Sequence, residues 1–240
     1  MPIGELLATD AVIDELYVDV DRWNATGEDD PLRVLVADAQ RRGVGVWAIP
    51  GRVFASVSDT ETPQGVIALV VRTPSSVASM AGLDGPILVM VDLADPGNAG
   101  TAVRAAAAAG CVGVVFAGQG TDPFGPKAVR AAAGAIARLP VAEEPDVLAA
   151  LDELHRAGRP LVATIAHGGV APESADLAGS IAVVVGSEAH GLPGHVRERC
   201  DHAVTIPMGS SVESINAAMA GAVVLFEAAR QRRTVQDPRK

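Results

Sequence analysis

The feature that most restricts the fold of this chain is an alternation of short valine-rich runs with longer alanine-rich runs. Runs such as Val112–Phe116 and Ile181–Val185 carry no polar side chain, which is typical of strands buried on both faces of a sheet. Alanine-rich runs such as 99–109 have the length and composition of helices. Because aromatic residues make up only 3% of the chain, the core must consist of Val, Ala, Leu and Ile. The alternation predicts an α/β fold with a mainly parallel sheet, covered on both faces by helices.

Residues 73–85 are small and turn-rich, and they separate two predicted domains, 1–76 and 77–240. The first is a small α/β unit. We expect its helices at Ile3–Ala8 and Pro31–Arg42, and its strands at Ile13–Val18, Val44–Ile49 and Val66–Val71. In the second domain we expect strands at Pro86–Val91, Val112–Phe116, Leu139–Val141, Pro160–Thr164, Ile181–Val185 and Ala203–Ile206. Its helices are expected from the Asp95 loop to Ala109, from the loop 117–126 to Arg138, and over Pro145–Ala157 and Ser214–Arg233.

The formal net charge of −10 argues against binding nucleic acid through overall charge. Residues 1–84 hold 13 Asp and Glu against 6 Lys and Arg, a balance of −7, and the other residues carry −3. If this protein binds RNA, local arginines must therefore hold it against an unfavourable overall field.

Composition also indicates where the protein works. No uncharged apolar run approaches the ~20 residues that span a bilayer, and no basic region followed by an apolar stretch stands at the N-terminus. Cys111 and Cys200 are far apart and form no metal-type cluster, so we interpret each as a small buried residue in a reducing compartment. We expect a cytoplasmic protein without a bound metal and without a membrane contact.

Ligands of parallel α/β sheets bind at the carboxyl ends of the strands, where three loops stand out. The first loop begins at Asp95 and leads into a helix that carries Arg104 among small apolar residues. Asp95 or Asn98 can cap that helix. The guanidinium fork of Arg104 suits a phosphate at this edge, and an ordinary surface or ion-paired arginine is the other interpretation.

The second loop follows a buried strand and begins with Gly186, where a missing side chain lets backbone approach a ligand closely. His190, in the same loop, has no second metal-type ligand near it in sequence, so we give it no catalytic role. The third segment, Ile206–Asn216, has an apolar start, a Gly/Ser loop and a capped helix. It could hold an adenosine by backbone contacts, or Ser211 or Ser214 could be a plain helix cap.

The usual nucleotide-binding and hydrolase spacings are missing from the sequence. There is no G-x-G-x-x-G after a strand, no Walker-type G-K-S/T and no G-x-S-x-G elbow. This weighs against a nucleotide-dependent enzyme with a Rossmann-type pocket.

Taken in order, the three segments resemble the signature motifs of the SpoU/TrmH family, S-adenosylmethionine-dependent RNA methyltransferases of the knotted SPOUT superfamily. The motif D-P-x-N-x-G-x-x-x-R is matched by Asp95, Pro96, Asn98, Gly100 and Arg104. The motif G-x-E-x-x-G-L is matched by Gly186, Glu188, Gly191 and Leu192. The motif I-P-M-x-x-x-x-x-S-L-N is matched by Ile206, Pro207, Met208, Ser214, Ile215 and Asn216, with Ile215 in place of Leu. Three gapped motifs in order are far more specific than any one of them.

Two further segments extend the resemblance. Residues 121–130 match a family segment, although Ala132 stands where the family usually has a serine. The N-terminal unit, with its turn Thr62-Pro63-Gln64-Gly65, resembles the small ribosomal-protein-like substrate domain of many members. Relative to that domain, Met1 falls almost at the first helix.

The resemblance implies a deep trefoil knot, a homodimer and S-adenosylmethionine as the methyl donor, with no metal. It implies methylation of a ribose 2′-hydroxyl in structured RNA. Arg104 would be the catalytic arginine, Asn98 would support its loop and the dimer interface, and Glu188, Ser214 and Asn216 would position the substrate side. The donor would contact Thr164, Gly186, Glu188, Gly191, Leu192, Ile206, Pro207, Met208, Ser214 and Ile215.

The substrate is less well defined by the sequence. The small domain favours ribosomal RNA over transfer RNA, and a role in antibiotic resistance stays open. We expect RNA contacts at Arg41, Arg42 and Arg52 of the small domain and at Arg130 near the active edge, with solvated surface arginine as the alternative for each. A paralogue that binds RNA without catalysis is a further alternative, against which the intact motif residues weigh.

Overall fold

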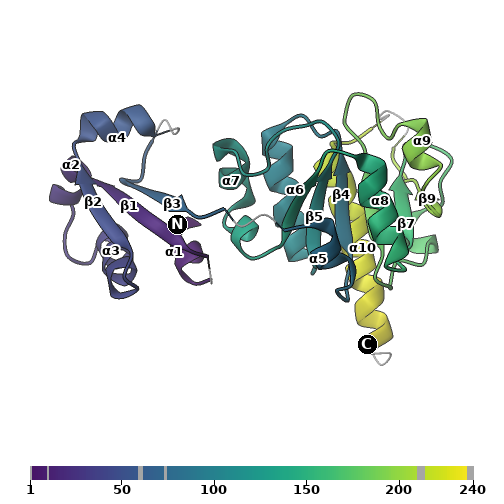
Figure 1. Cartoon of the computed structure of the whole chain (residues 1–240), viewed down its shortest axis with the longest axis horizontal. Coiled ribbons are helices and arrows are strands. Elements are labelled where there is room, and N and C mark those ends of the chain that lie inside the picture. The colour runs from purple at the N-terminus through teal and green to yellow at the C-terminus, as the bar shows by residue number, and fades with distance from the viewer. Residues whose placement is uncertain (1, 10, 59–61, 73–74, 210–213, 237–240) are drawn as a thin grey trace. The chain divides into compact units, whose positions relative to one another are not determined.

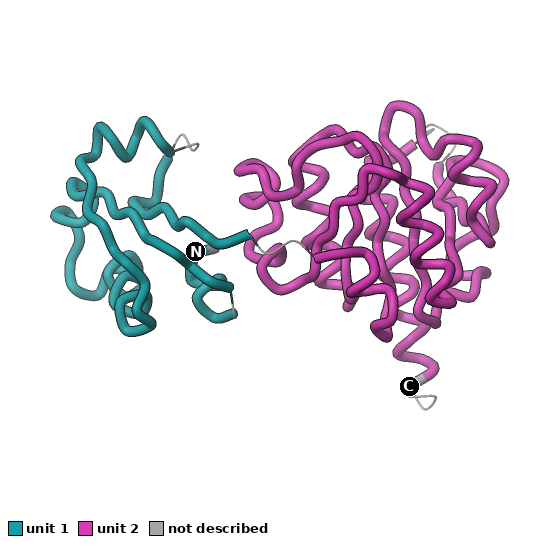
Figure 2. The backbone as a smooth tube through the Cα atoms, in the orientation of Figure 1, with its two compact units in different colours: residues 1–73 teal, residues 74–240 magenta. Residues whose placement is uncertain are grey.

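A computed structural model describes residues 2–9, 11–58, 62–72, 75–209 and 214–236 of the chain. The chain forms two compact units, residues 1–73 and 74–240 (Figure 2). Residues 210–213 of the Gly/Ser loop, among them the candidate helix cap Ser211, lie outside the described residues.

The smaller unit contains a three-stranded sheet with the order β2-β1-β3. Strand β1 (Ile13–Asp19) runs parallel to β2 (Gly45–Ile49) and antiparallel to β3 (Val66–Val70). Its helices are α1 (Pro2–Leu7), α2 (Val20–Asn24), α3 (Pro31–Arg41) and α4 (Gly51–Val57). Asp30 caps α3 and Pro31 occupies its first turn, as expected for a strong helix start. The apolar face of α3 buries Leu32, Leu35, Val36 and Ala39, which together with Leu16 and Val18 of β1 belong to the core of the unit.

The larger unit contains a six-stranded, entirely parallel sheet with the order β6-β5-β4-β8-β7-β9, which confirms the predicted fold class (Figure 1). Its strands are β4 (Ile87–Val91), β5 (Gly113–Ala117), β6 (Val141–Glu144), β7 (Leu161–Thr164), β8 (Ala182–Val185) and β9 (His202–Val204). Its helices are α5 (Val77–Ala81), α6 (Pro96–Ala108), α7 (Pro126–Ala132), α8 (Val147–Arg156), α9 (Gly194–Arg197) and α10 (Ala217–Gln236), with 3₁₀ turns η1 (Ala135–Ala137) and η2 (Pro172–Ser174).

Both faces of this sheet are covered, because successive side chains of a strand point to opposite faces. Leu88 and Met90 of β4 pack in one cluster with residues of α6, α7 and α10. Ile87, Val89 and Val91 pack in a second cluster with residues of α5, α8 and α9. The two clusters explain why the inner strands β4, β5 and β8 are apolar at every position.

Several predicted boundaries were wrong. The helix expected to reach Arg138 ends at Ala132, because Ala133 and Gly134 adopt left-handed backbone with φ of 48° and 83°. Helix α5 lies in the segment expected to be only turns. The last helix begins at Ala217 rather than Ser214, because the Asn216 side chain accepts hydrogen bonds from the backbone N–H groups of Ala218 (2.9 Å) and Met219 (3.2 Å).

A buried arginine binds the backbone at the end of α5 and in the residues that follow it. Arg159 is 2% exposed, and its guanidinium donates hydrogen bonds to the carbonyl oxygens of Ala81 (2.7 Å), Gly85 (2.5 Å) and Leu83. Burial lowers the pKa of Arg159, although a nearby Asp84 carboxylate opposes that shift. The carbonyl groups satisfy a charge that would otherwise be costly to bury.

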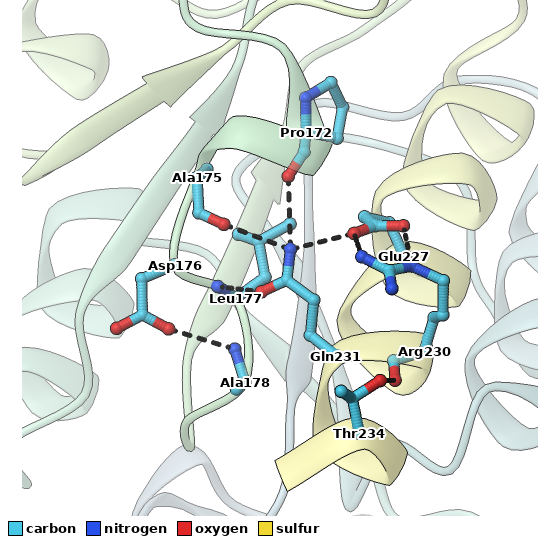
Figure 3. A network of polar contacts seen from close by, with 9 residues as sticks. All are labelled: Pro172, Ala175, Asp176, Leu177, Ala178, Glu227, Arg230, Gln231 and Thr234. Atoms are coloured by element: carbon cyan, nitrogen blue, oxygen red, sulfur yellow. Dashed lines mark hydrogen bonds and ion pairs between the residues drawn. The ribbon is translucent and has the colours of Figure 1, made fainter. Parts of the chain in front are cut away.

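A polar network ties α10 to the connection between β7 and β8 (Figure 3). The Gln231 amide donates to the carbonyl of Ala175 (3.1 Å) and accepts from the backbone N–H of Leu177 (2.9 Å). Glu227 accepts hydrogen bonds from both Gln231 (2.8 Å) and Arg230 (2.7 Å). The hydrogen bond from Arg230 is the main reason why the pKa of Glu227 falls to about 2. The network fixes this connection against the last helix, while the trefoil knot stays a prediction.

Two other observations bear on the sequence analysis. Among the described residues, every helix is too short or too polar to cross a membrane. Burial raises the pKa of the Cys111 thiol to about 12 and that of Cys200 to about 11, so both thiols are protonated at neutral pH.

Candidate active site

A cavity of about 330 Å³ lies at the carboxyl ends of β7 and β8. It is lined by the ends of these two strands and the residues that follow them, by Ile206 and Met208, and by residues at the start of α10. The lining residues are Thr164, Ile165, Ala166, Val185, Gly186, Ser187, Glu188, His190, Gly191, Ile206, Met208, Ser214, Ile215, Ala217 and Ala220. The second and third motif segments therefore meet in one pocket, although they are separate in sequence.

Most of the predicted donor contacts lie in this pocket. The structure brings together Thr164, Gly186, Glu188, Gly191, Ile206, Met208, Ser214 and Ile215. The two exceptions do not line it. Leu192 packs on the core cluster that contains α5 and α8, and Pro207 is exposed.

Gly186 has a structural reason to be glycine. A Cβ atom at this position would overlap the backbone of Gly191 and Leu192, because the loop folds back tightly on itself. Gly191 adopts left-handed backbone with φ of 62° and donates its N–H to the Ser187 carbonyl (2.9 Å). The tight fold leaves backbone of the loop directly exposed to the pocket.

The hydroxyl of Thr164 is the one buried side-chain oxygen or nitrogen without a hydrogen-bond partner in the described part of the chain. Thr164 ends β7 and lines the pocket. A buried polar atom without a partner is costly. A ligand in the pocket with a polar group at this position would satisfy it.

Asn98 connects all three motif segments. Its side-chain N–H₂ donates to a carboxylate oxygen of Glu188 (2.5 Å), and its side-chain oxygen accepts from the Asn216 amide (2.8 Å). Its backbone N–H donates to the Asp95 carboxylate (2.8 Å). This network holds the first and third segments together at the rim of the pocket, through groups 118 positions apart in sequence.

Asp95 and Gly100 of the first segment shape α6. Asp95 caps the helix, and its pKa is lowered first by the hydrogen bond from the Asn98 backbone and then by Lys127, whose ammonium lies 3.2 Å away. A Cβ at Gly100 would collide with the Ala128 carbonyl, so glycine permits the close packing of α6 on α7. Neither residue lines the pocket.

Arg104 is exposed on α6 and lies outside the pocket. Within the described ranges it makes no hydrogen bond or ion pair. Helix α10, which packs against α6, exposes Met219, Val223 and Phe226 at spacings of four and three residues. This spacing places the three apolar side chains on one stripe of α10.

Comparison with known proteins identifies the family. The model of the SpoU rRNA methylase family matches residues 85–226, and the model of the RNA 2′-O ribose methyltransferase substrate-binding domain matches residues 2–74. The chain belongs to the SpoU rRNA methylase family. The predicted family and the nature of the small domain are thus confirmed, and the protein is an RNA methyltransferase.

Individual relatives agree with this assignment. A Mycobacterium tuberculosis protein described as an uncharacterized tRNA/rRNA methyltransferase is 35% identical over 100% of this chain and 75% of its own length. The structure of AviRb from Streptomyces viridochromogenes in complex with AdoMet is 27% identical, with a TM-score of 0.82, and covers 97% of this chain and 88% of its own. An AdoMet-bound rRNA methyltransferase from Sinorhizobium meliloti is 26% identical, with a TM-score of 0.81, over 95% and 84% of the two chains.

The arginines predicted to contact RNA in this SpoU-family protein differ in their surroundings. Arg41 and Arg42 both pair with Asp38 at 3.2 and 3.1 Å. Arg52 is exposed on α4, and Arg130 is exposed on α7. Because Asp38 pairs with Arg41 and Arg42, Arg52 is better placed than these two arginines to bind a phosphate.

Sequence reasoning missed some of the pocket. Ile165 and Ala166 line it because they follow β7, as Gly186 follows β8. His190, which received no catalytic role, also lines it. The common position after a parallel strand could have revealed Ile165 and Ala166.

Proposed function

We propose that this SpoU-family protein transfers a methyl group from S-adenosylmethionine to a ribose 2′-hydroxyl of RNA, with ribosomal RNA as the favoured substrate. The observation that carries the proposal is the Glu188–Asn98–Asn216 network at the rim of the cavity. It joins the loop that bears the predicted catalytic helix to both loops of the predicted donor pocket. Relatives with the same architecture have been solved with AdoMet bound.

The residues of the pocket fit this donor. Ile206, Met208 and Ile215 offer an apolar surface for an adenosine, and the loop at Gly186 offers backbone hydrogen-bonding groups. The unpartnered Thr164 hydroxyl supplies a polar contact inside the cavity. When bound, S-adenosylmethionine supplies an electrophilic methyl group on a sulfonium.

The chain itself must lower the cost of negative charge on the attacking ribose oxygen. Arg104 is a poor base, because a guanidinium has a pKa above about 12. We assign it to clamp the phosphate next to the target ribose, so that its charge stabilises the developing oxyanion. Glu188 and Asn216 position the ribose side of the pocket through Asn98.

We also propose that the protein acts as a homodimer. Arg104 is exposed and lies outside the pocket, and the neighbouring helix exposes the stripe of Met219, Val223 and Phe226. Burial of this stripe against a second copy would bring the exposed face of α6 into the interface. The arginine of one protomer would then serve the pocket of the other.

Methyl transfer from labelled S-adenosylmethionine to unmodified RNA tests the proposal. Separate reactions contain ribosomal RNA and transfer RNA, and the label is mapped to the nucleotide and to its base or sugar. We expect label on a ribose of ribosomal RNA. Label on a base would contradict the 2′-hydroxyl, and binding of RNA without any transfer would favour a non-catalytic paralogue.

Transfer RNA is the second candidate substrate. The M. tuberculosis relative is described for both RNA classes, and a structure concerning 2-OH methylation of C/U34 on tRNA is 31% identical over 61% of this chain, with a TM-score of 0.56. That likeness does not extend to the whole chain, whereas the Sinorhizobium meliloti rRNA methyltransferase matches 95% of it. Stronger labelling of transfer RNA would reverse the preference.

A further inference from the structure

One face of the small sheet carries two aromatic side chains and a carboxylate. The strand register places Tyr17 directly opposite Trp47, and Glu15 directly opposite Gly45. Residues opposite each other on neighbouring strands share a face of the sheet. We call the surface formed by Glu15, Tyr17, Gly45 and Trp47 the aromatic face. The alternate residues of β1, Leu16 and Val18, are buried on the other side.

The two rings are held by the same carboxylate. The Trp47 indole donates to one oxygen of Glu15 (3.1 Å), and the Tyr17 hydroxyl donates to the other. The rings therefore have fixed orientations. Because these side chains are already ordered, stacking of a ligand on them costs little side-chain entropy.

The aromatic face is open. Trp47 is 54% exposed in a chain whose aromatic content is only 3%. Trp23, the other tryptophan, is covered by the Arg33 guanidinium at 4.3 Å, whereas in the described ranges no cation covers Trp47.

Gly45 keeps space free next to the indole. A Cβ built on Gly45 would lie 3.6 Å from the indole nitrogen and 4.0 Å from Cγ of Glu15, both ordinary contact distances. A longer side chain at Gly45 would extend over this part of the face.

The charge of the unit limits what the aromatic face can bind. Residues 1–73 hold 12 Asp and Glu against 6 Lys and Arg, a balance of −6. Phosphates are therefore repelled by the unit as a whole, and Glu15 adds a negative group at the face itself. A nucleobase, by contrast, has a neutral ring to stack on the indole and N–H groups that a carboxylate accepts.

We propose that the aromatic face binds an unpaired base of the RNA substrate, by stacking on Trp47 and by a hydrogen bond from an exocyclic amino group of the base to Glu15. The match of residues 2–74 to an RNA substrate-binding domain favours RNA over a protein ligand. The inference rests on the proposed function only in taking RNA as the substrate. It predicts a preference for cytosine, which has an amino group, over uracil, which has a carbonyl at the same ring position.

Binding of single-stranded oligocytidine and oligouridine of equal length to the full chain tests the proposal. We expect tighter binding of oligocytidine. Trp47→Ala should weaken it at least about fivefold, as loss of one stacked base does, and leave the salt dependence of binding unchanged because no phosphate contact is lost. Trp47→Phe should keep most of the affinity. Gly45→Val should weaken binding with Trp47 intact, and Glu15→Gln should reduce the preference for cytosine.

Trp23→Phe is the matched control and should leave binding unchanged. Thermal unfolding tests whether each variant is folded. Oligonucleotide binding that is unaffected by Trp47→Ala would overturn the inference. The inference would also be overturned if Trp47→Ala lost binding to an arginine-rich peptide but still bound RNA like the wild type. That result would make the aromatic face a binding site for protein. If the wild-type chain methylates no RNA, the proposed function fails. If it does methylate RNA and Trp47→Ala matches its kcat and KM, only this inference fails.

Discussion

The pocket of the larger unit and the surface of the smaller unit use polar side chains in different ways. In the larger unit, Asn98, Glu188 and Asn216 come from distant segments and satisfy one another at the cavity. In the smaller unit, Arg41 and Arg42 pair with Asp38 on the same helix. The first arrangement needs the complete fold, whereas the second needs only one turn of helix. Polar groups joined across segments thus depend on the complete fold, and we propose that the Asn98 network, which reaches the pocket through Glu188, belongs to the reacting centre.

The largest expected effect follows from removing Arg104. We expect Arg104→Ala to lower kcat about 100- to 1,000-fold, because it removes the proposed phosphate clamp that would stabilise charge on the attacking oxygen. Affinity for S-adenosylmethionine should not change, since we assign Arg104 to the phosphate of the RNA and not to the donor. Single-turnover methyl transfer and calorimetry measure the two quantities separately. Full turnover by Arg104→Lys, which lacks the planar fork, would contradict the phosphate clamp.

A smaller loss is expected at Asn98. Asn98→Ala leaves both Glu188 and Asn216 without their partner, and we expect kcat to fall about 10- to 100-fold through misplacement of the site. Stability should fall by about 1–3 kcal/mol. Asn98→Asp separates the two bonds, because it still accepts from Asn216 but cannot donate to Glu188. If urea unfolding and kcat of Asn98→Ala both match those of the wild type, the network is not part of the site.

Thr164 offers a test in which two effects have opposite signs. Thr164→Val removes a buried hydroxyl that has no partner, so the ligand-free protein should become more stable by about 1 kcal/mol. Affinity for S-adenosylmethionine should fall about fivefold if the donor uses that hydroxyl, since the net value of one hydrogen bond is of this order. Thermal unfolding with and without the donor measures both. If Thr164→Val unfolds at a lower temperature than the wild type both with and without the donor, the hydroxyl has a structural role instead.

The sequence predicted the parallel sheet of the larger unit because its inner strands β4, β5 and β8 are buried on both faces and are apolar at every position. Helices α2 and α4 were missed because they have only five and seven residues and little periodicity to detect. Helix α5 was missed for the same reason, and the carbonyls at its end, those of Met80 and Ala81, accept hydrogen bonds from Arg159, 79 and 78 positions away in sequence. Short helices of this kind depend on caps and tertiary contacts rather than on their own pattern.

The predicted pocket shows a similar limit. Neighbouring residues of an extended segment point in opposite directions, so a linear motif cannot tell which of them face a ligand. Ile206 and Met208 line the cavity, whereas Pro207 between them does not. Gly191 lines it, whereas Leu192 packs in the core. Contacts such as Asn98–Asn216 join distant loops and were visible only in the structure.

The polar network of Glu227, Arg230 and Gln231 on α10 gives a prediction about the pH dependence of stability. Hydrogen bonds from Arg230, the larger cause, and from Gln231 lower the pKa of Glu227 from 4.5 to about 2. Glu227 therefore stabilises the fold above pH 4.5 and loses that contribution as the pH falls towards 2. We expect the contribution to be about 1 kcal/mol, reduced by solvent because Arg230 is 54% exposed. Urea unfolding of the wild type and of Glu227→Gln should differ at pH 6 and converge near pH 2. A constant difference across this range would mean that the charge of Glu227 is unimportant.

The smallest effect concerns the arginines of the small unit. Arg52→Ala should weaken RNA binding about two- to fivefold and reduce the slope of log K against log salt by about 1, as loss of one phosphate contact does. Arg41→Ala should have less effect, because Arg41 already pairs with Asp38. Asp38→Ala sharpens the comparison: it frees Arg41 and Arg42 and should strengthen RNA binding in low salt. If Arg41→Ala weakens binding more than Arg52→Ala does, the local ion pair does not keep these arginines from the RNA.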